Sequence, residues 1–240
     1  MLSFMIKPSA SLVLACLSGT GMTATSDYYS YETNGADWGT IHDGKWSLCD
    51  TGKEQSPIDL RTNAPFNTKL QLRRYNYFDF DGSYSEPLSS NKGRKVNFPT
   101  CTRKDAMLRL ITASNIQESF APAQLHFHAP SEHTVDGRFY DLEVHFVHTG
   151  TYTSFAVVGV FFDVMEGGSE MNPFISDVLE VLRTGNDPDV LKRKELRLLD
   201  FFDTIDQGEF WSYPGSFTTP PCTEGVRWSV LKEVQPISRA

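Results

Sequence analysis

The sequence predicts a single α+β domain, mainly β, in which a mostly antiparallel sheet is accompanied by a few helices. Several short apolar segments are separated by turn-rich stretches, and only one stretch shows a clear helical periodicity. The 240 residues contain no internal repeat or low-complexity linker, and contents of 40% hydrophobic and 22% charged residues are ordinary for a globular protein. A chain of this length can bury a dry pocket.

Residues 1–24 are predicted to be a secretory signal peptide whose end is approximate. Lys7 precedes the apolar run 12–17, small residues follow, and the first acidic residue is Asp27. This pattern is typical of an export signal and is too short for a membrane span. Lipoprotein-type cleavage at Cys16 is a less favoured alternative. We therefore expect a secreted or otherwise exported protein (extracellular, periplasmic or luminal), and no later segment is long and apolar enough to cross a bilayer.

Three cysteines remain after removal of the signal: Cys49, Cys101 and Cys222. An odd number in an exported chain leaves one thiol over. We predict a disulfide between Cys49 and Cys222, with Cys101 as either a buried thiol or an intersubunit link. The alternative, in which all three are reduced, is less favoured for an exported protein.

The domain is predicted to begin at residue 27, with a loop-rich region to residue 60. Short strands are expected after it, each bounded by turn-forming residues. Their ranges are 70–77, 95–98, 107–112, 123–128, 142–148, 155–162 and 226–231.

One helix is predicted between the last two of these strands. Pro173 suits a first helical position, and Gly185 lies just past the end. Between them the apolar spacing i, i+3, i+4, i+7 is kept by Ile175, Val178, Leu179 and Leu182. The Gly/Pro-rich run 213–221 is predicted to be a shaped loop.

Three histidines are placed where one metal ion could collect them. His126 and His128 flank Phe127, and His145 follows seventeen residues after His128 (145 − 128) in a second apolar segment. Because alternate side chains of a strand share a face, three imidazoles converge if the two segments are neighbours in one sheet. Three histidines without a fourth protein ligand are the set expected of catalytic zinc. Ordinary surface or core histidines are the alternative.

Two polar residues occur at the right spacing to orient these histidines. Gln124 lies two residues before His126, and Glu143 lies two before His145, so each shares the face of its histidine. Each can accept the spare imidazole N–H and thereby fix the tautomer.

The acidic balance of the chain limits its partners. A formal net charge of −8 disfavours nucleic acid and anionic membranes, and no Lys- or Arg-rich run opposes this. The sequence therefore indicates a small-molecule function.

Several blocks together resemble the α-class (eukaryotic-type) carbonic anhydrases. They are 55–59 (QSPID), 124–136 (QLHFHAPSEHTVD), 143–148 (EVHFVH) and 213–221 (YPGSFTTPP), with Trp228 and Leu231-Lys232 beyond. The resemblance covers residues about 38 to 235 in the family's order. It implies a carbonate dehydratase, a Zn²⁺ lyase that interconverts CO₂ and bicarbonate on a large twisted, mostly antiparallel central sheet. Sulfonamides or anions would inhibit at the zinc.

The resemblance also implies roles in catalysis. Zinc held by His126, His128 and His145 lowers the pKa of a bound water to about 7, so that zinc hydroxide acts as the nucleophile. Thr218 would accept a hydrogen bond from the hydroxide and donate one to the buried carboxylate of Glu132. These two bonds would aim the hydroxide oxygen at CO₂.

The substrate site is implied in the same way. The Thr218 amide would hold a developing bicarbonate oxygen, and Thr219 would line the same site. The positions that line the family's apolar CO₂ slot are occupied here by Val147, Val157, Phe217 and Trp228. His133 and His148 match histidines that are structural in the family.

The sequence departs from the family pattern at functional positions. Arg94 stands where fast members carry a shuttle histidine, and arginine keeps its proton, so we predict slow proton release. His42 is a less favoured substitute shuttle. Phe217 replaces a common leucine and should narrow the slot, and Thr40 follows Trp38-Gly39 where a tyrosine is usual.

The chain stops at Ala240, so the domain at 27–240 is expected to lack the family's C-terminal segment. If so, the alternative is a non-catalytic, secreted carbonic-anhydrase-like binding or matrix protein. A zinc esterase is a third reading, which the small slot makes less suitable.

Overall fold

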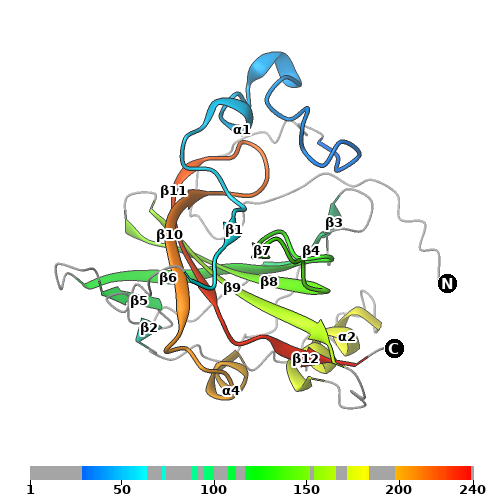
Figure 1. The fold of residues 1–240 in the computed structure, drawn as a ribbon, viewed down its shortest axis with the longest axis vertical. Helices are drawn as coiled ribbons and strands as arrows, with labels where there is room; N and C mark the ends of the chain where they lie inside the picture. The colour runs from blue at the N-terminus through cyan, green and yellow to red at the C-terminus, as the bar shows by residue number, and fades with distance from the viewer. Residues whose placement is uncertain are drawn as a thin grey trace.

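The computed structural model describes residues 29–63, 72–73, 88–90, 95–99, 108–111, 117–151, 154–165, 172–183 and 198–238 (Figure 1). The expected signal peptide, Arg94 and Cys101 lie outside these residues. Within the described part of the chain, no helix is long and apolar enough to cross a membrane.

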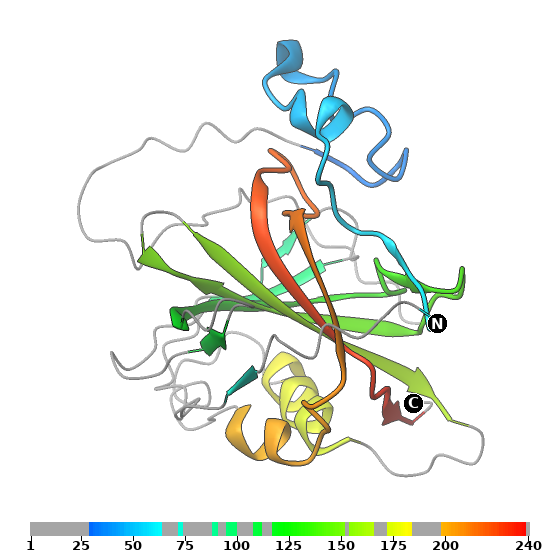
Figure 2. The same cartoon turned by 60° about the vertical axis from the view of Figure 1, so that its left-hand side comes forward.

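A large mixed sheet forms the centre of the molecule (Figures 1 and 2). The strand order is β10-β11-β9-β8-β6-β4-β3, with β5 beside β6, β2 beside β5 and β12 beside β9. Most neighbours are antiparallel, as predicted, but β11 and β12 both run parallel to β9. The strands are β2 (Leu72–Arg73), β3 (Leu88–Ser90), β4 (Lys95–Pro99), β5 (Leu108–Ile111), β6 (Gln117–His128), β8 (Leu142–Thr149), β9 (Phe155–Val164), β10 (Phe210–Ser216), β11 (Glu224–Leu231) and β12 (Gln235–Ile237).

Two helices cover one side of this sheet. α2 (Pro173–Arg183) and α4 (Leu198–Asp203) lie together below it, whereas the N-terminal segment with η1 (His42–Gly44) and α1 (Leu48–Thr51) lies on the opposite side (Figures 1 and 2). Phe127, Val144 and Phe146 of β6 and β8 pack in the core that includes residues of these helices. The Phe146 ring, for example, lies 6.0 Å from that of Phe201. Because side chains alternate along a strand, the neighbouring histidines face away from the helices.

Most predicted elements are found, with shifted ends. The helix begins at Pro173 as predicted. The amides of Phe174 and Ile175 donate to the Asn172 carboxamide, an N-cap that was not predicted. β6 begins at Gln117, six residues before the predicted start, because its first residues pair with β5. α4 and β12 were not predicted.

Residues 213–216 contradict the prediction of a loop, because they form the end of strand β10. Glycine and proline indicate a turn locally, but β10 is at the edge of the described sheet and pairs there only with β11. An edge strand tolerates Pro214 because one row of its backbone groups has no ladder partner. A register shift between Gly215 and Ser216 ends the regular pairing, and the residues that follow do form a loop.

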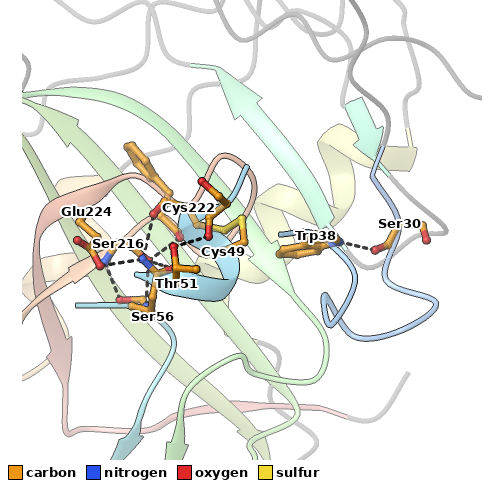
Figure 3. Close-up of a disulfide and its surroundings, with 11 residues drawn as sticks. Ser30, Trp38, Cys49, Thr51, Ser56, Ser216, Cys222 and Glu224 are labelled. Carbon is orange, nitrogen blue, oxygen red and sulfur yellow. Dashed lines mark hydrogen bonds between the residues drawn. A yellow bond between two sulfur atoms is a disulfide. The ribbon is translucent and has the colours of Figure 1, made fainter. Parts of the chain in front are cut away.

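A disulfide joins Cys49 of α1 to Cys222 in this loop, which is the pairing predicted from the sequence (Figure 3). Beside it, the Glu224 carboxylate accepts the amides of Lys53 and Glu54. The hydrogen bond from the Glu54 amide leads the causes that lower the pKa of Glu224. The N-terminal segment is thus fastened to the start of β11. A smaller pair of parallel strands, β1 (Asp59–Leu60) and β7 (Thr134–Val135), follows that segment.

Candidate metal centre

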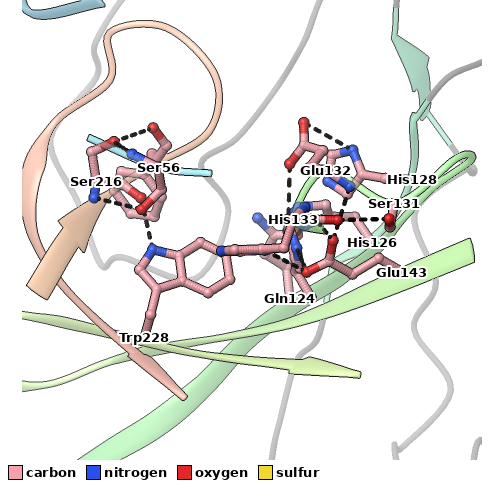
Figure 4. Close-up of polar contacts among 12 residues, drawn as sticks. Ser56, Gln124, His126, His128, Ser131, Glu132, His133, Glu143, Ser216 and Trp228 are labelled. Atoms are coloured by element: carbon pink, nitrogen blue, oxygen red, sulfur yellow. Dashed lines mark hydrogen bonds and ion pairs between the residues drawn. The ribbon is translucent and has the colours of Figure 1, made fainter. Parts of the chain in front are cut away.

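Three histidine rings meet on the face of the sheet opposite the core residues that pack against the helices. Figure 4 shows two of them, His126 and His128, near Glu132. β6 and β8 are antiparallel neighbours, and their register places His126 directly opposite His145. One ligand nitrogen from each of His126, His128 and His145 lies within 4.8 Å of the others. The three residues are only 5%, 3% and 1% exposed. The predicted convergence of these imidazoles is therefore present in the structure.

Two of the rings are oriented by the residues expected to do so. Gln124 Oε1 lies 2.8 Å from Nδ1 of His126, and Glu143 Oε1 lies 2.8 Å from Nε2 of His145. The remaining nitrogens, Nε2 of His126 and Nδ1 of His145, are 3.2 Å apart. With His128 they form the three-imidazole donor set of a catalytic zinc site, so the residues present fit Zn²⁺.

Glu143 is a fully buried carboxylate with four donors around it. Its Oε1 also lies 2.7 Å from Nδ1 of His133, and its Oε2 accepts the amides of Glu132 and His133 at 2.9 Å. Burial raises the pKa of Glu143, but the attraction and hydrogen bonds of His133 and His145 outweigh it and hold that pKa well below its usual range. The group is therefore a fixed anion that accepts hydrogen bonds and donates none.

A series of hydrogen-bonded side chains extends from Glu143 through His133 and Tyr213 to Ser56. Nε2 of His133 lies 2.6 Å from the Tyr213 hydroxyl, which in turn lies 2.8 Å from Oγ of Ser56. Burial raises the pKa of Tyr213 above its usual range, so the phenol keeps its proton. No role for Tyr213 or Ser56 was predicted from the sequence. The QSPID and YPGSF blocks that contain them were the available signal.

The Glu132 carboxylate lies against the histidines, and Thr218 lies in the loop after β10. The Glu132 carboxylate lies 3.2 Å from Nδ1 of His128 and 3.9 Å from Nδ1 of His145. Thr218 is buried within the loop after β10, where the Cys222 amide donates to the carbonyl of Thr219 at 2.9 Å.

The four predicted slot residues do lie in one apolar cluster. Val157 is opposite Val147 on β8 and opposite Trp228 on β11. The Trp228 ring lies 4.8 Å from that of His145, so this cluster adjoins the histidines. Phe217 packs against the cluster, with its ring 4.8 Å from that of Phe155.

Comparison with known proteins identifies relatives over most of the chain. Residues 34–240 match the family described as eukaryotic-type carbonic anhydrase. The chain is 33% identical over 216 residues to Alpha carbonic anhydrase 8 of Arabidopsis thaliana, covering 88% of this chain and 52% of that relative, so it spans about half of that protein's length.

Two solved structures are similar in fold. One is the α-carbonic anhydrase of Thermovibrio ammonificans with the inhibitor sulfanilamide, at a TM-score of 0.62 and 31% identity, covering 88% of this chain and 86% of that one. The other is dioscorin complexed with ascorbate, at a TM-score of 0.67 and 28% identity, covering 88% and 84%.

Proposed function

Because the chain belongs to the eukaryotic-type carbonic anhydrase family, we propose that it catalyses the reversible hydration of CO₂ to bicarbonate and a proton. The observation that supports this best is the buried convergence of three imidazoles beside an apolar cluster. His126, His128 and His145 would hold Zn²⁺. When bound, Zn²⁺ lowers the pKa of a water molecule enough to make it a nucleophile near neutral pH.

The surrounding residues would prepare the site for a small apolar substrate. Gln124 and Glu143 keep the outer imidazole nitrogens protonated, so that His126 and His145 present lone pairs inward. Val147, Val157 and Trp228 offer an apolar wall that suits CO₂, and Phe217 narrows it. This wall also excludes bulk water, which strengthens the polar interactions inside the site.

Thr218 and Glu132 would orient the reacting water. A threonine hydroxyl can accept a hydrogen bond from that water in a fixed direction only if its own proton is accepted elsewhere. Glu132 is the acceptor we propose, and its carboxylate lies beside the histidines, 3.2 Å from Nδ1 of His128. The Thr218 amide and Thr219 would then contact the product bicarbonate.

Proton release would limit turnover. Arg94 occupies the position at which fast relatives carry a histidine, and arginine does not exchange its proton near neutral pH. We expect kcat to rise when imidazole buffer is added, because the buffer carries the proton instead. A kcat that is indifferent to buffer concentration would refute this part. His42 is exposed and is a less favoured candidate for the same role, tested by His42→Ala.

Stopped-flow CO₂ hydration by the zinc-loaded protein, with and without sulfanilamide, tests the proposal. We expect hydration that sulfanilamide inhibits and that His145→Ala abolishes together with zinc binding. His148→Gln is the matched control, because His148 is an equally buried histidine on the opposite face of the same strand.

A protein that binds zinc without hydrating CO₂ would instead support a non-catalytic binding or matrix role. Hydrolysis of an activated ester without CO₂ hydration would support a zinc esterase. Export, which the disulfide favours, is tested by locating the processed chain after expression with its own N-terminus.

A further inference from the structure

Ser56 touches two parts of the site that lie far from it in sequence. Its hydroxyl lies 2.8 Å from the Tyr213 hydroxyl and accepts the Ser216 amide at 3.1 Å. Its own amide donates to Oγ of Ser216 at 2.9 Å. Tyr213 contacts His133, whereas Ser216 is the last residue of β10 before the loop that carries Thr218. Figure 4 shows Ser56 beside Ser216.

The direction of each hydrogen bond in the Tyr213 branch follows from the acceptors available. Ionised Glu143 can only accept, so the facing nitrogens of His133 and His145 must both carry protons. If His133 is neutral, its Nε2 accepts the Tyr213 proton, and the Tyr213 oxygen accepts the proton of Ser56.

The reversed hydrogen bonds, from His133 to Tyr213 and from Tyr213 to Ser56, leave the Ser56 proton without an acceptor among the contacts of that hydroxyl. If His133 donated to Tyr213, the Tyr213 proton would go to Ser56, whose oxygen already accepts the Ser216 amide. The Ser56 proton would then lack an acceptor among the contacts of that hydroxyl. Only the first arrangement gives the Ser56 proton an acceptor among the contacts of that hydroxyl, so Ser56 donates to Tyr213 and Tyr213 donates to His133.

We propose that Ser56 is a positioning residue: through Tyr213 it holds His133 and with it the Glu143 carboxylate behind His145, and through Ser216 it holds the loop of Thr218. The proposal rests on the proposed function for its catalytic meaning, but the hydrogen bonds that carry it do not depend on activity. Ser56 is 89 residues from His145 (145 − 56) and 162 residues from Thr218 (218 − 56), so the coupling exists only in the folded chain.

The backbone at this point is shaped to admit Ser56. A Cβ added at Gly215 would lie 2.2 Å from Oγ of Ser56 and 2.7 Å from the Tyr213 ring. The indole N–H of Trp228 donates to the Ser216 carbonyl at 2.9 Å. This hydrogen bond joins the contact between Ser56 and the end of β10, called the Ser56 junction below, to the apolar wall. The strand end, the hydroxyl and the tyrosine therefore fit together as one packed unit.

Two measurements that need no turnover test the proposal. The rate of zinc loss to a chelator reports the His145 branch, and hydrogen exchange of the Phe217 and Cys222 amides reports the loop. Ser56→Ala should raise both rates about fivefold, the factor that one lost neutral hydrogen bond predicts. Tyr213→Phe should raise only zinc loss, and Ser216→Ala should raise only loop exchange.

Ser212→Ala is the matched control, because Ser212 is also on β10 and its hydroxyl donates to the Trp228 carbonyl at 2.9 Å. It should change neither rate. In the metal-free protein, NMR should show protected imidazole N–H signals for His133 and His145 that Ser56→Ala weakens and Ser212→Ala retains.

Ser56→Ala with both rates within about twofold of the wild type would overturn the proposal. Equal changes of both rates in Tyr213→Phe and Ser216→Ala would also overturn it, because they would indicate general softening. If Ser56→Ala does not fold, the selectivity of those two single variants decides the question. A wild-type protein that binds zinc but is inactive would refute the proposed function and leave these readouts valid. If it bound no zinc, the NMR signals and loop exchange would still test the proposal.

Discussion

His148 should make the protein lose stability in mild acid. It is fully buried on β8, and its Nδ1 lies 3.3 Å from the carbonyl of Ala156 on β9. Burial lowers its pKa from 6.5 to about 4, although hydrogen bonds with the backbone of Ala156 and Phe146 act in the opposite direction. The residue is therefore neutral in the folded protein under conditions in which the unfolded chain takes up a proton.

The size and sign of the effect follow from this difference. As the pH falls, the unfolded chain is protonated near pH 6.5 and the folded protein only near pH 4, so stability is complete above 6.5 and is lost between these values. The full loss is about 3 kcal/mol, at about 1.4 kcal/mol for each pKa unit, and about 2 kcal/mol of it has occurred by pH 5.

Urea unfolding between pH 7.5 and 5 measures this loss. His148→Gln keeps a donor for the Ala156 carbonyl but does not titrate, so the difference between variant and wild type isolates His148. Both proteins are measured with excess chelator, so that zinc release does not contribute. Phe146→Leu, a core change on the same strand, should keep the wild-type pH dependence. Identical pH dependence in His148→Gln and the wild type, within about 0.5 kcal/mol, would refute the reasoning.

Three further predictions concern the framework of the site. Reducing the disulfide of Cys49 and Cys222 should lower the free energy of unfolding by about 3–5 kcal/mol, and an unchanged urea midpoint in reductant would contradict this. Asn172→Ala should cost about 1 kcal/mol by removing the cap of α2, whereas Asn172→Asp should retain most of the stability in the same assay. Gly215→Ala should cost about 1–3 kcal/mol, because its Cβ would meet Ser56, and a thermal midpoint equal to that of the wild type would show that the junction relaxes.

The histidines and the Thr218 loop depend on different contacts. The histidine pair on β6 and β8 is set by one antiparallel register, but the loop with Thr218 depends on contacts from the N-terminal segment. The disulfide and the Glu224 carboxylate fasten that same segment. Loss of these contacts should therefore disturb the Thr218 loop before the histidines separate.

The cluster of three histidines could be predicted from the sequence because it follows from a local rule. Side chains alternate along a strand, so an H-x-H segment and a second strand with a histidine in phase place three imidazoles on one face once the strands pair. The same two-residue period predicted that Gln124 and Glu143 lie on the face of His126 and His145. The apolar residues between them likewise had to face the helices, as Phe127 and Phe146 do.

The tertiary structure alone decided the features that depend on distant partners. Residues 213–216 read as a loop because glycine and proline act locally, and they form a strand because β11 supplies hydrogen bonds to an edge. Glu132 lies against His128, which its position in the sequence did not indicate. Tyr213 and Ser56 are 157 residues apart, and no short-range period relates them. Periodicity tells which face a side chain takes, but only packing of the folded chain determines which atom it meets there.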